Sequence, residues 1–150
     1  MSTNSNVVDT LNELTLFIND RIEGYKHAVE DSKDPEHKAY YQQLVSQSQQ
    51  FANELNGFAS SAGGDAETST TTKGKFFRGW MDAKALVTGK DEKGILNSNV
   101  YGEEWALKAY QDALETPDLP APVRQAIERQ YETSQQTYQK LKSLGGVSHP

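Results

Sequence analysis

The sequence predicts an all-α protein that folds as an antiparallel four-helix bundle, in one domain spanning residues 1–150. Three observations support this prediction. Apolar residues recur every three or four positions along four long segments, which is the spacing of one helix face. Short stretches rich in proline or glycine separate these segments. Only 35% of the residues are hydrophobic, and a bundle tolerates this composition because each helix needs a single apolar stripe.

The first predicted helix begins with a cap at Asn6 and ends near Asp31, because Asp34-Pro35 follows. Residues 1–5 are expected to be flexible. The inward stripe of this helix steps by three or four residues through Val7, Leu11, Leu14, Ile18, Ile22, Tyr25 and Val29.

A second helix is predicted to start at Asp34-Pro35-Glu36, which combines a capping side chain, a proline in the first turn and a carboxylate at the positive helix end. Gly63-Gly64 ends it. Its inward stripe consists of His37, Tyr41, Leu44, Ser48, Phe51, Leu55 and Phe58. His37 lies in the first turn, near the end of the bundle, so a partly exposed structural histidine is expected there.

Residues 61–74 form a polar linker that is longer than the usual ~2–8 residues of a bundle connection. Such a linker either crosses from one end of the bundle to the other or is mobile. Residues 75–88 regain helical periodicity and predict a short extra helix before the third long one.

The third long helix is predicted to follow the break at Gly89 and the cap at Asp91, and to end near Glu115. Its stripe is Leu96, Val100, Glu103, Ala106, Leu107, Tyr110 and Leu114. Three prolines mark the next turn, and the last helix has its stripe at Val123, Ile127, Gln130, Ser134, Thr137, Leu141 and Leu144. Residues 145–150 are expected to fray. Gly24 and Gly102 lie in mid-helix and predict close approach of the first and third long helices.

Two helical hairpins joined by a long crossover are the ferritin-like arrangement. Several local sequences also resemble a bacterial family of small ferritin-like four-helix-bundle proteins, catalogued as a domain of unknown function. These sequences are Arg21-Ile22-Glu23-Gly24-Tyr25, Arg78-Gly79-Trp80-Met81-Asp82, Leu86-Val87-Thr88-Gly89-Lys90-Asp91 and Gly102-Glu103-Glu104-Trp105-Ala106-Leu107-Lys108-Ala109-Tyr110. The resemblance implies the fold and a bacterial source, and it implies no activity.

Ferritin-like di-iron sites take one Glu from each of two helices and a Glu-x-x-His pair from each of the other two. The three histidines of this chain, His27, His37 and His149, have no Glu three residues before them. The sequence therefore predicts neither an intact di-iron site nor any other cofactor. A degraded or unconventional site for iron or manganese, centred on Glu23 and Glu103, remains as an alternative.

Glu103 lies on the inward stripe of its helix, and a buried carboxylate is costly unless it finds a partner. The candidate donors are Tyr25, Gln130 and Ser134. Ser48 and Ser134 also point inward and could approach each other across the core. Glu23 lies beside the stripe of the first helix, where a surface pair with His27 is expected.

The segment from Lys73 to Lys90 carries a local charge of +4 on a protein whose net charge is −6. Its interaction candidates are Phe76, Phe77, Arg78, Trp80 and Lys84. A basic amphipathic helix is typical of a membrane-surface or partner-binding element. The alternative is a helix that covers the open end of the bundle and leaves its lysines in solvent.

The composition, the net charge and the absence of known motifs exclude several classes of function. An acidic surface disfavours nucleic-acid binding, and the absence of cysteine excludes thiol catalysis and disulfides. No secretory signal or membrane-spanning run is visible, so a cytoplasmic location is expected. No catalytic motif or catalytic residue is predicted.

The leading hypothesis is a non-enzymatic bundle that associates with itself or a protein partner through residues 75–88 or its Gln- and Tyr-rich faces. Metal binding and peripheral membrane association are the alternatives.

Overall fold

The computed structural model describes residues 3–65, 67 and 92–145, and these residues contain four helices and no strand. The helices are α1 (Thr3–Asp31), α2 (Pro35–Ser61), α4 (Glu92–Leu114) and α5 (Ala121–Ser143). The predicted all-α four-helix bundle is confirmed. The predicted extra helix over 75–88 and most of the predicted linker lie outside the described residues.

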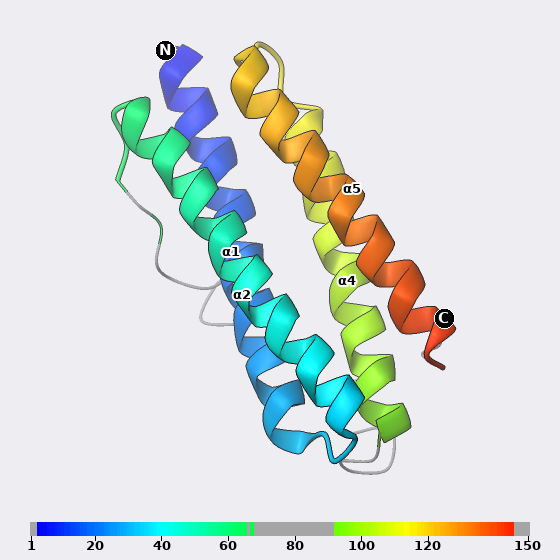
Figure 1. Ribbon diagram of the computed structural model, residues 1–150. Helices are drawn as coiled ribbons and strands as arrows, with labels where there is room; N and C mark the ends of the chain where they lie inside the picture. The colour runs from blue at the N-terminus through cyan, green and yellow to red at the C-terminus, as the bar shows by residue number, and fades with distance from the viewer. Residues whose placement is uncertain (1–2, 66, 68–91, 146–150) are drawn as a thin grey trace.

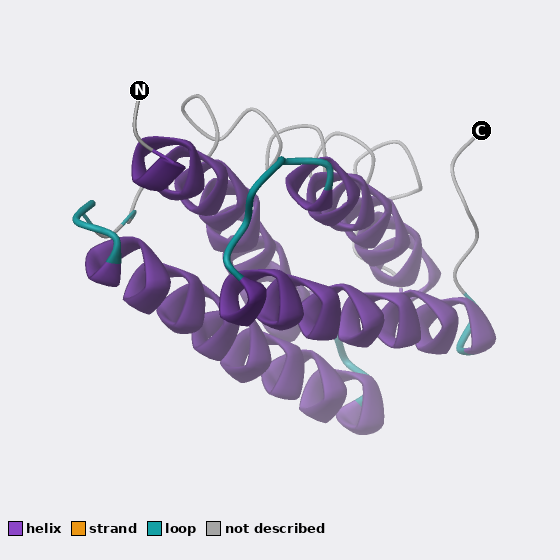
Figure 2. Ribbon diagram, turned by 90° about the horizontal axis from the view of Figure 1, so that it is seen from above, coloured by secondary structure: helices purple, strands orange, loops and turns teal. Residues whose placement is uncertain are grey.

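The helices form two hairpins that pack side by side, α1 with α2 and α4 with α5 (Figure 1). Seen from above, α1 and α4 make one layer of the bundle, and α2 and α5 make the other (Figure 2). The contact between α1 and α4 closes the first layer. Each helix runs antiparallel to both of its neighbours (Figure 1).

The ends of the helices follow from local chemistry. The Asp34 carboxylate accepts hydrogen bonds from the backbone N–H groups of Glu36 at 2.9 Å and His37 at 3.2 Å, so the predicted cap of α2 is confirmed. Beyond α2, Gly63 has φ +92°, a left-handed conformation that favours glycine.

The start of α1 was predicted too late. The helix begins at Thr3, so Asn6 lies inside it and does not cap it. Residues 3–6 contain no proline or glycine that would break a helix. All four residues are of types that cap helices, so the sequence does not indicate which of them begins the helix.

The core consists of two apolar clusters, one at each end of the bundle. The first cluster includes Val7, Leu11, Leu14, Ile18, Phe51, Leu55, Tyr110, Val123 and Ile127. The second cluster includes Tyr25, Ala28, Tyr41, Leu44, Ile95, Leu96, Val100 and Leu141. Between them, at the level of Ser48 and Ser134, every described helix turns a polar or charged side chain inward. The bundle therefore has a polar layer between two apolar halves.

The predicted stripe of α1 was wrong at two positions. Arg21 and Ala28 are buried, whereas Ile22 and Val29 are only partly buried. The spacing of four and three that joins Leu11, Leu14 and Ile18 continues to Arg21, and the bundle geometry follows this spacing. Four other predicted core residues are also partly buried: Phe58, Leu107, Leu114 and Leu144.

Candidate functional site

An ion pair between Arg21 of α1 and Glu103 of α4 lies at the centre of the polar layer. Arg21 Nη2 is 2.7 Å from Glu103 Oε1, and Nε lies 3.1 Å from Oε1 and 3.0 Å from Oε2. Both side chains are 0% exposed. The guanidinium thus engages both carboxylate oxygens, which is the strong geometry for this pair.

Two serines extend the ion pair to the other layer of the bundle. Arg21 Nη1 donates to Ser48 Oγ of α2 at 2.9 Å, and Ser134 Oγ of α5 donates to Glu103 Oε1 at 3.1 Å. The Ser48 hydroxyl in turn donates a hydrogen bond to the Leu44 carbonyl at 2.6 Å. One side chain from each of the four described helices therefore belongs to a single hydrogen-bonded group, which we call the central network (Arg21, Ser48, Glu103 and Ser134).

The electrostatics of the central network keep Arg21 charged. Burial alone would lower the pKa of the guanidinium, but the charge of Glu103 and its hydrogen bonds outweigh burial and raise that pKa above its ordinary value. The guanidinium carbon also lies 5.3 Å from the ring centre of Tyr25 and 5.9 Å from that of Phe51. Burial, followed by the charge of Glu103, raises the pKa of Tyr25 well above its usual value.

A second polar group lies next to the central network. The buried Gln130 side chain accepts from Tyr110 Oη at 2.9 Å and donates to Glu54 Oε1 at 2.7 Å. Arg129 Nη2 lies 2.6 Å from Glu54 Oε2. The hydrogen bonds from Arg129 lower the pKa of Glu54. These contacts join α4, α5 and α2.

A third polar cluster ties the turn between α1 and α2 to the start of α4. The Glu92 carboxylate accepts from Ser32 Oγ and from the Lys33 backbone N–H, both at 2.7 Å, and lies 3.1 Å from His37 Nδ1. Burial alone would raise the pKa of Glu92, but these hydrogen bonds lower it on balance. His37 is thus partly exposed and structural, as predicted.

The donor set of the central network does not fit a di-iron centre. It offers one carboxylate, whose two oxygens already bind a guanidinium, together with two neutral hydroxyls. A permanent positive charge inside the layer also repels a metal cation. Among the described residues, no group of three or more His, Cys, Asp or Glu side chains could hold a metal ion.

The two candidate metal ligands lie in different environments. Glu103 is buried in the central network, whereas the Glu23 side chain is 46% exposed and lies 3.9 Å from Lys26 Nζ. Of the three donors proposed for Glu103, Ser134 binds it and Gln130 is engaged elsewhere. The prediction overlooked Arg21, the main partner.

The interaction candidates Phe76, Phe77, Arg78, Trp80 and Lys84 lie outside the described residues. Within the described part of the chain, no helix combines the length and the hydropathy that crossing a membrane requires.

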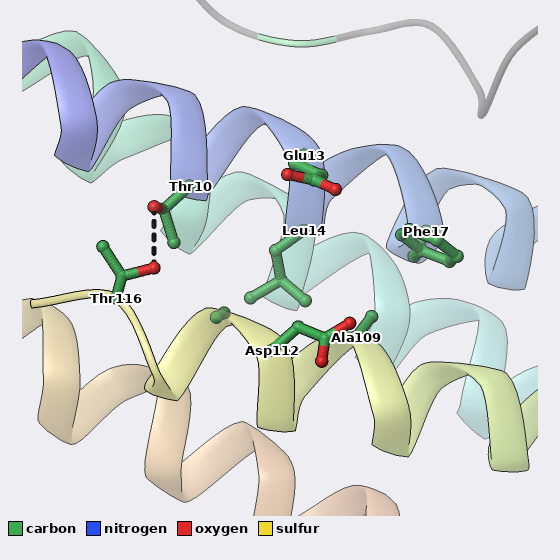
Figure 3. Close-up of a pocket in the computed structure, with 8 residues that line it drawn as sticks. Thr10, Glu13, Leu14, Phe17, Ala109, Asp112 and Thr116 are labelled. Carbon is green, nitrogen blue, oxygen red and sulfur yellow. Dashed lines mark hydrogen bonds between the residues drawn. The ribbon is translucent and has the colours of Figure 1, made fainter.

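A hollow of about 100 Å³ lies between α1 and α4 at the end where the chain begins (Figure 3). Thr10 and Thr116 hydrogen-bond across it at 3.0 Å, and the carboxylates of Glu13 and Asp112 lie farther along its edge. Both carboxylates are exposed, and the two threonine hydroxyls hydrogen-bond to each other.

The exposed sides of α2 and α5 carry a surface of neutral amides. Residues 39–53 contain no charged side chain, although charged residues make up 24% of the protein. We call this surface the amide face, and the exposed glutamines that line its hollows are Gln42, Gln43, Gln50, Gln135, Gln136 and Gln139. Each helix has a shallow hollow there, and Lys140 of α5 reaches across to the ring of Tyr40 on α2, 5.5 Å from its centre.

Residues 6–116 match the family described as "Domain of unknown function (DUF2383)". The chain belongs to this family. The resemblance noted from the sequence is thereby confirmed, and DUF2383 membership carries no assigned activity.

A solved structure shows the same fold. It is titled "Crystal structure of ferritin like, diiron-carboxylate proteins from Bacillus anthracis str. Ames". The match has a TM-score of 0.75 and 17% identity, and it covers 96% of this chain and 99% of that one. At this identity the likeness establishes the ferritin-like fold alone. No protein with a curated description matches the sequence.

Proposed function

We propose that this DUF2383 protein is a non-enzymatic bundle that acts by associating with itself or with a protein partner. One observation carries the proposal. The central network fills the interior with a neutralised ion pair whose hydrogen bonds are made, so neither a substrate nor a metal finds free ligands there. A partner is therefore expected to bind at the surface of the bundle and not in its interior.

The amide face supports a role in association. Interface centres are depleted in charged residues, because desolvating a charge is costly unless it is paired. Glutamine side chains both donate and accept hydrogen bonds, so they suit contact with another polar surface. A location in the cytoplasm, which the sequence predicts, is compatible with this role.

Metal analysis of protein purified without a histidine tag tests the proposal. After incubation with iron, manganese or zinc and removal of free metal, we expect far less than one ion per chain. Near-stoichiometric metal that is lost in Glu103→Ala would overturn the proposal and support a ferritin-like metal protein.

Peripheral membrane association through residues 75–88 remains a prediction. Co-sedimentation with anionic vesicles at low salt tests it, and absence of binding ends it.

A further inference from the structure

We propose that a second copy of this chain docks on the amide face, with the two α5 helices antiparallel about a two-fold axis at Gln136. In this arrangement Glu132 of each copy faces Lys140 of the other. The inference rests on the proposed function, association, and identifies the binding partner as a second copy of the chain.

The charge pattern of α5 is self-complementary about Gln136. Residues 133–139 are uncharged, Glu132 precedes this stretch and Lys140 follows it. Each charged residue is four positions from Gln136, so all three share one side of the helix. Two such helices in antiparallel contact place opposite charges together at both ends.

The surface around this axis is open. Glu132, Gln136 and Lys140 are exposed and line a shallow hollow on α5. The other residues of the hollow are Gln135, Gln139 and Ser143, all exposed and uncharged. An antiparallel helix therefore meets amides at the centre and one ion pair at each end.

Electrostatics favour a second copy at this place over the other faces. The chain has a net charge of −6, so two copies repel each other in most orientations. Glu132 and Lys140 balance each other on the Gln136 side of α5, and Arg129, about one turn before Glu132, is paired with Glu54 of α2, so this repulsion is absent locally. A two-fold axis forms every contact twice, and a pattern that complements itself is what such an interface requires.

The neighbouring helix extends the same surface. The ammonium of Lys140 lies over Tyr40 of α2, where α2 and α5 meet. Farther along α2, Gln43, Gln47 and Gln50 line the second hollow. The two-fold contact can therefore spread from α5 onto an uncharged part of α2.

Analytical ultracentrifugation of the full chain across micromolar to sub-millimolar concentrations at low salt tests the inference. We expect a concentration-dependent dimer. Glu132→Lys and Lys140→Glu should each raise the dimer Kd at least about tenfold, because each puts two like-charge contacts into the interface. The double variant E132K/K140E should restore the Kd to near the wild-type value.

Two variants outside this side of α5 control for net charge. Glu30→Lys, at an exposed position of α1, changes the total charge as Glu132→Lys does, and Lys142→Glu matches Lys140→Glu. Both should leave the Kd within about twofold of wild type. Equal weakening by the controls, or failure of the double variant to restore dimerisation, would overturn the inference.

The outcomes separate this inference from the proposed function. A chain that remains monomeric at every concentration overturns the two-fold contact and leaves association with a different partner in place. Stoichiometric metal that depends on Glu103 overturns the proposed function, whatever the oligomeric state.

Discussion

Arg21 and Glu103 form a fully buried ion pair, and each depends on the other. Removing one partner of such a pair leaves an uncompensated charge in the core, whereas replacing both by apolar residues of similar size is often tolerated. Breaking the pair should therefore cost much more stability than replacing both of its residues.

A double-mutant cycle measures this dependence. Arg21→Met and Glu103→Met should each lower the free energy of unfolding by about 3–5 kcal/mol. The double variant R21M/E103M should lie much closer to wild type, so the coupling energy in urea unfolding should exceed the loss measured for either single variant. Additive losses would show that the two charges do not depend on each other.

The end of α2 shows how an element is joined to its neighbour. A Cβ atom at Gly64 would lie 2.5 Å from Cγ1 of Val8, so this glycine allows the chain after α2 to lie against α1. Gly57 lies inside α2 with no atom within 4 Å of the position of a Cβ. A side chain at position 64 would therefore meet Val8, whereas a side chain at position 57 would have open space.

Alanine at these two positions should change stability in opposite directions. Gly57→Ala should stabilise by about 0.5–1 kcal/mol, because alanine loses less backbone entropy in a helix. Gly64→Ala should destabilise by about 1–3 kcal/mol through overpacking against Val8. Thermal and urea unfolding of both variants check the signs, and a shift in the same direction for both would contradict the assignment.

At the scale of the whole molecule, polar contacts join the two hairpins at different heights. Glu92 connects the α1–α2 turn to α4, Arg21 and Glu103 connect α1 to α4, and Glu54 connects α2 to α5. The carboxyl groups of Glu92 and Glu54 are partly exposed, and folding lowers the pKa of each. They make the stability of the assembled bundle depend on pH.

The sign of that dependence follows from the lowered pKa of Glu92. A carboxyl with a folded-state pKa below its unfolded value of about 4.3 contributes its stability above that value. The contribution is lost as the pH falls through the folded-state pKa, because the unfolded chain binds more protons. The melting temperature should therefore decrease below about pH 4.5.

Glu92→Gln should reduce the acid-induced decrease in melting temperature between about pH 4.5 and 3, since glutamine does not titrate. Glu115→Gln, at an exposed position, controls for the loss of one negative charge. If both variants reproduce the wild-type pH profile, the Glu92 cluster makes no contribution to it.

The location of the polar layer could be predicted, but its chemistry could not. Glu103, Ser48 and Ser134 interrupt apolar stripes, so periodicity alone places them inside. The burial of Arg21 was not predicted, because an apolar residue, Ile22, lies next to it and a charged side chain is not expected in a core. The strict spacing of four and three from Leu14 through Ile18 was the signal that pointed to it.

The sequence by itself determined the four helices of the described residues and most of their ends, because these depend on neighbours within a few residues. Asp34 caps α2, and glycines follow α2 and α5. Only the tertiary structure decided what fills the interior. Arg21 and Glu103 are 82 residues apart and meet because α1 packs against α4, so no local pattern reveals their contact. That contact occupies both oxygens of the Glu103 carboxylate.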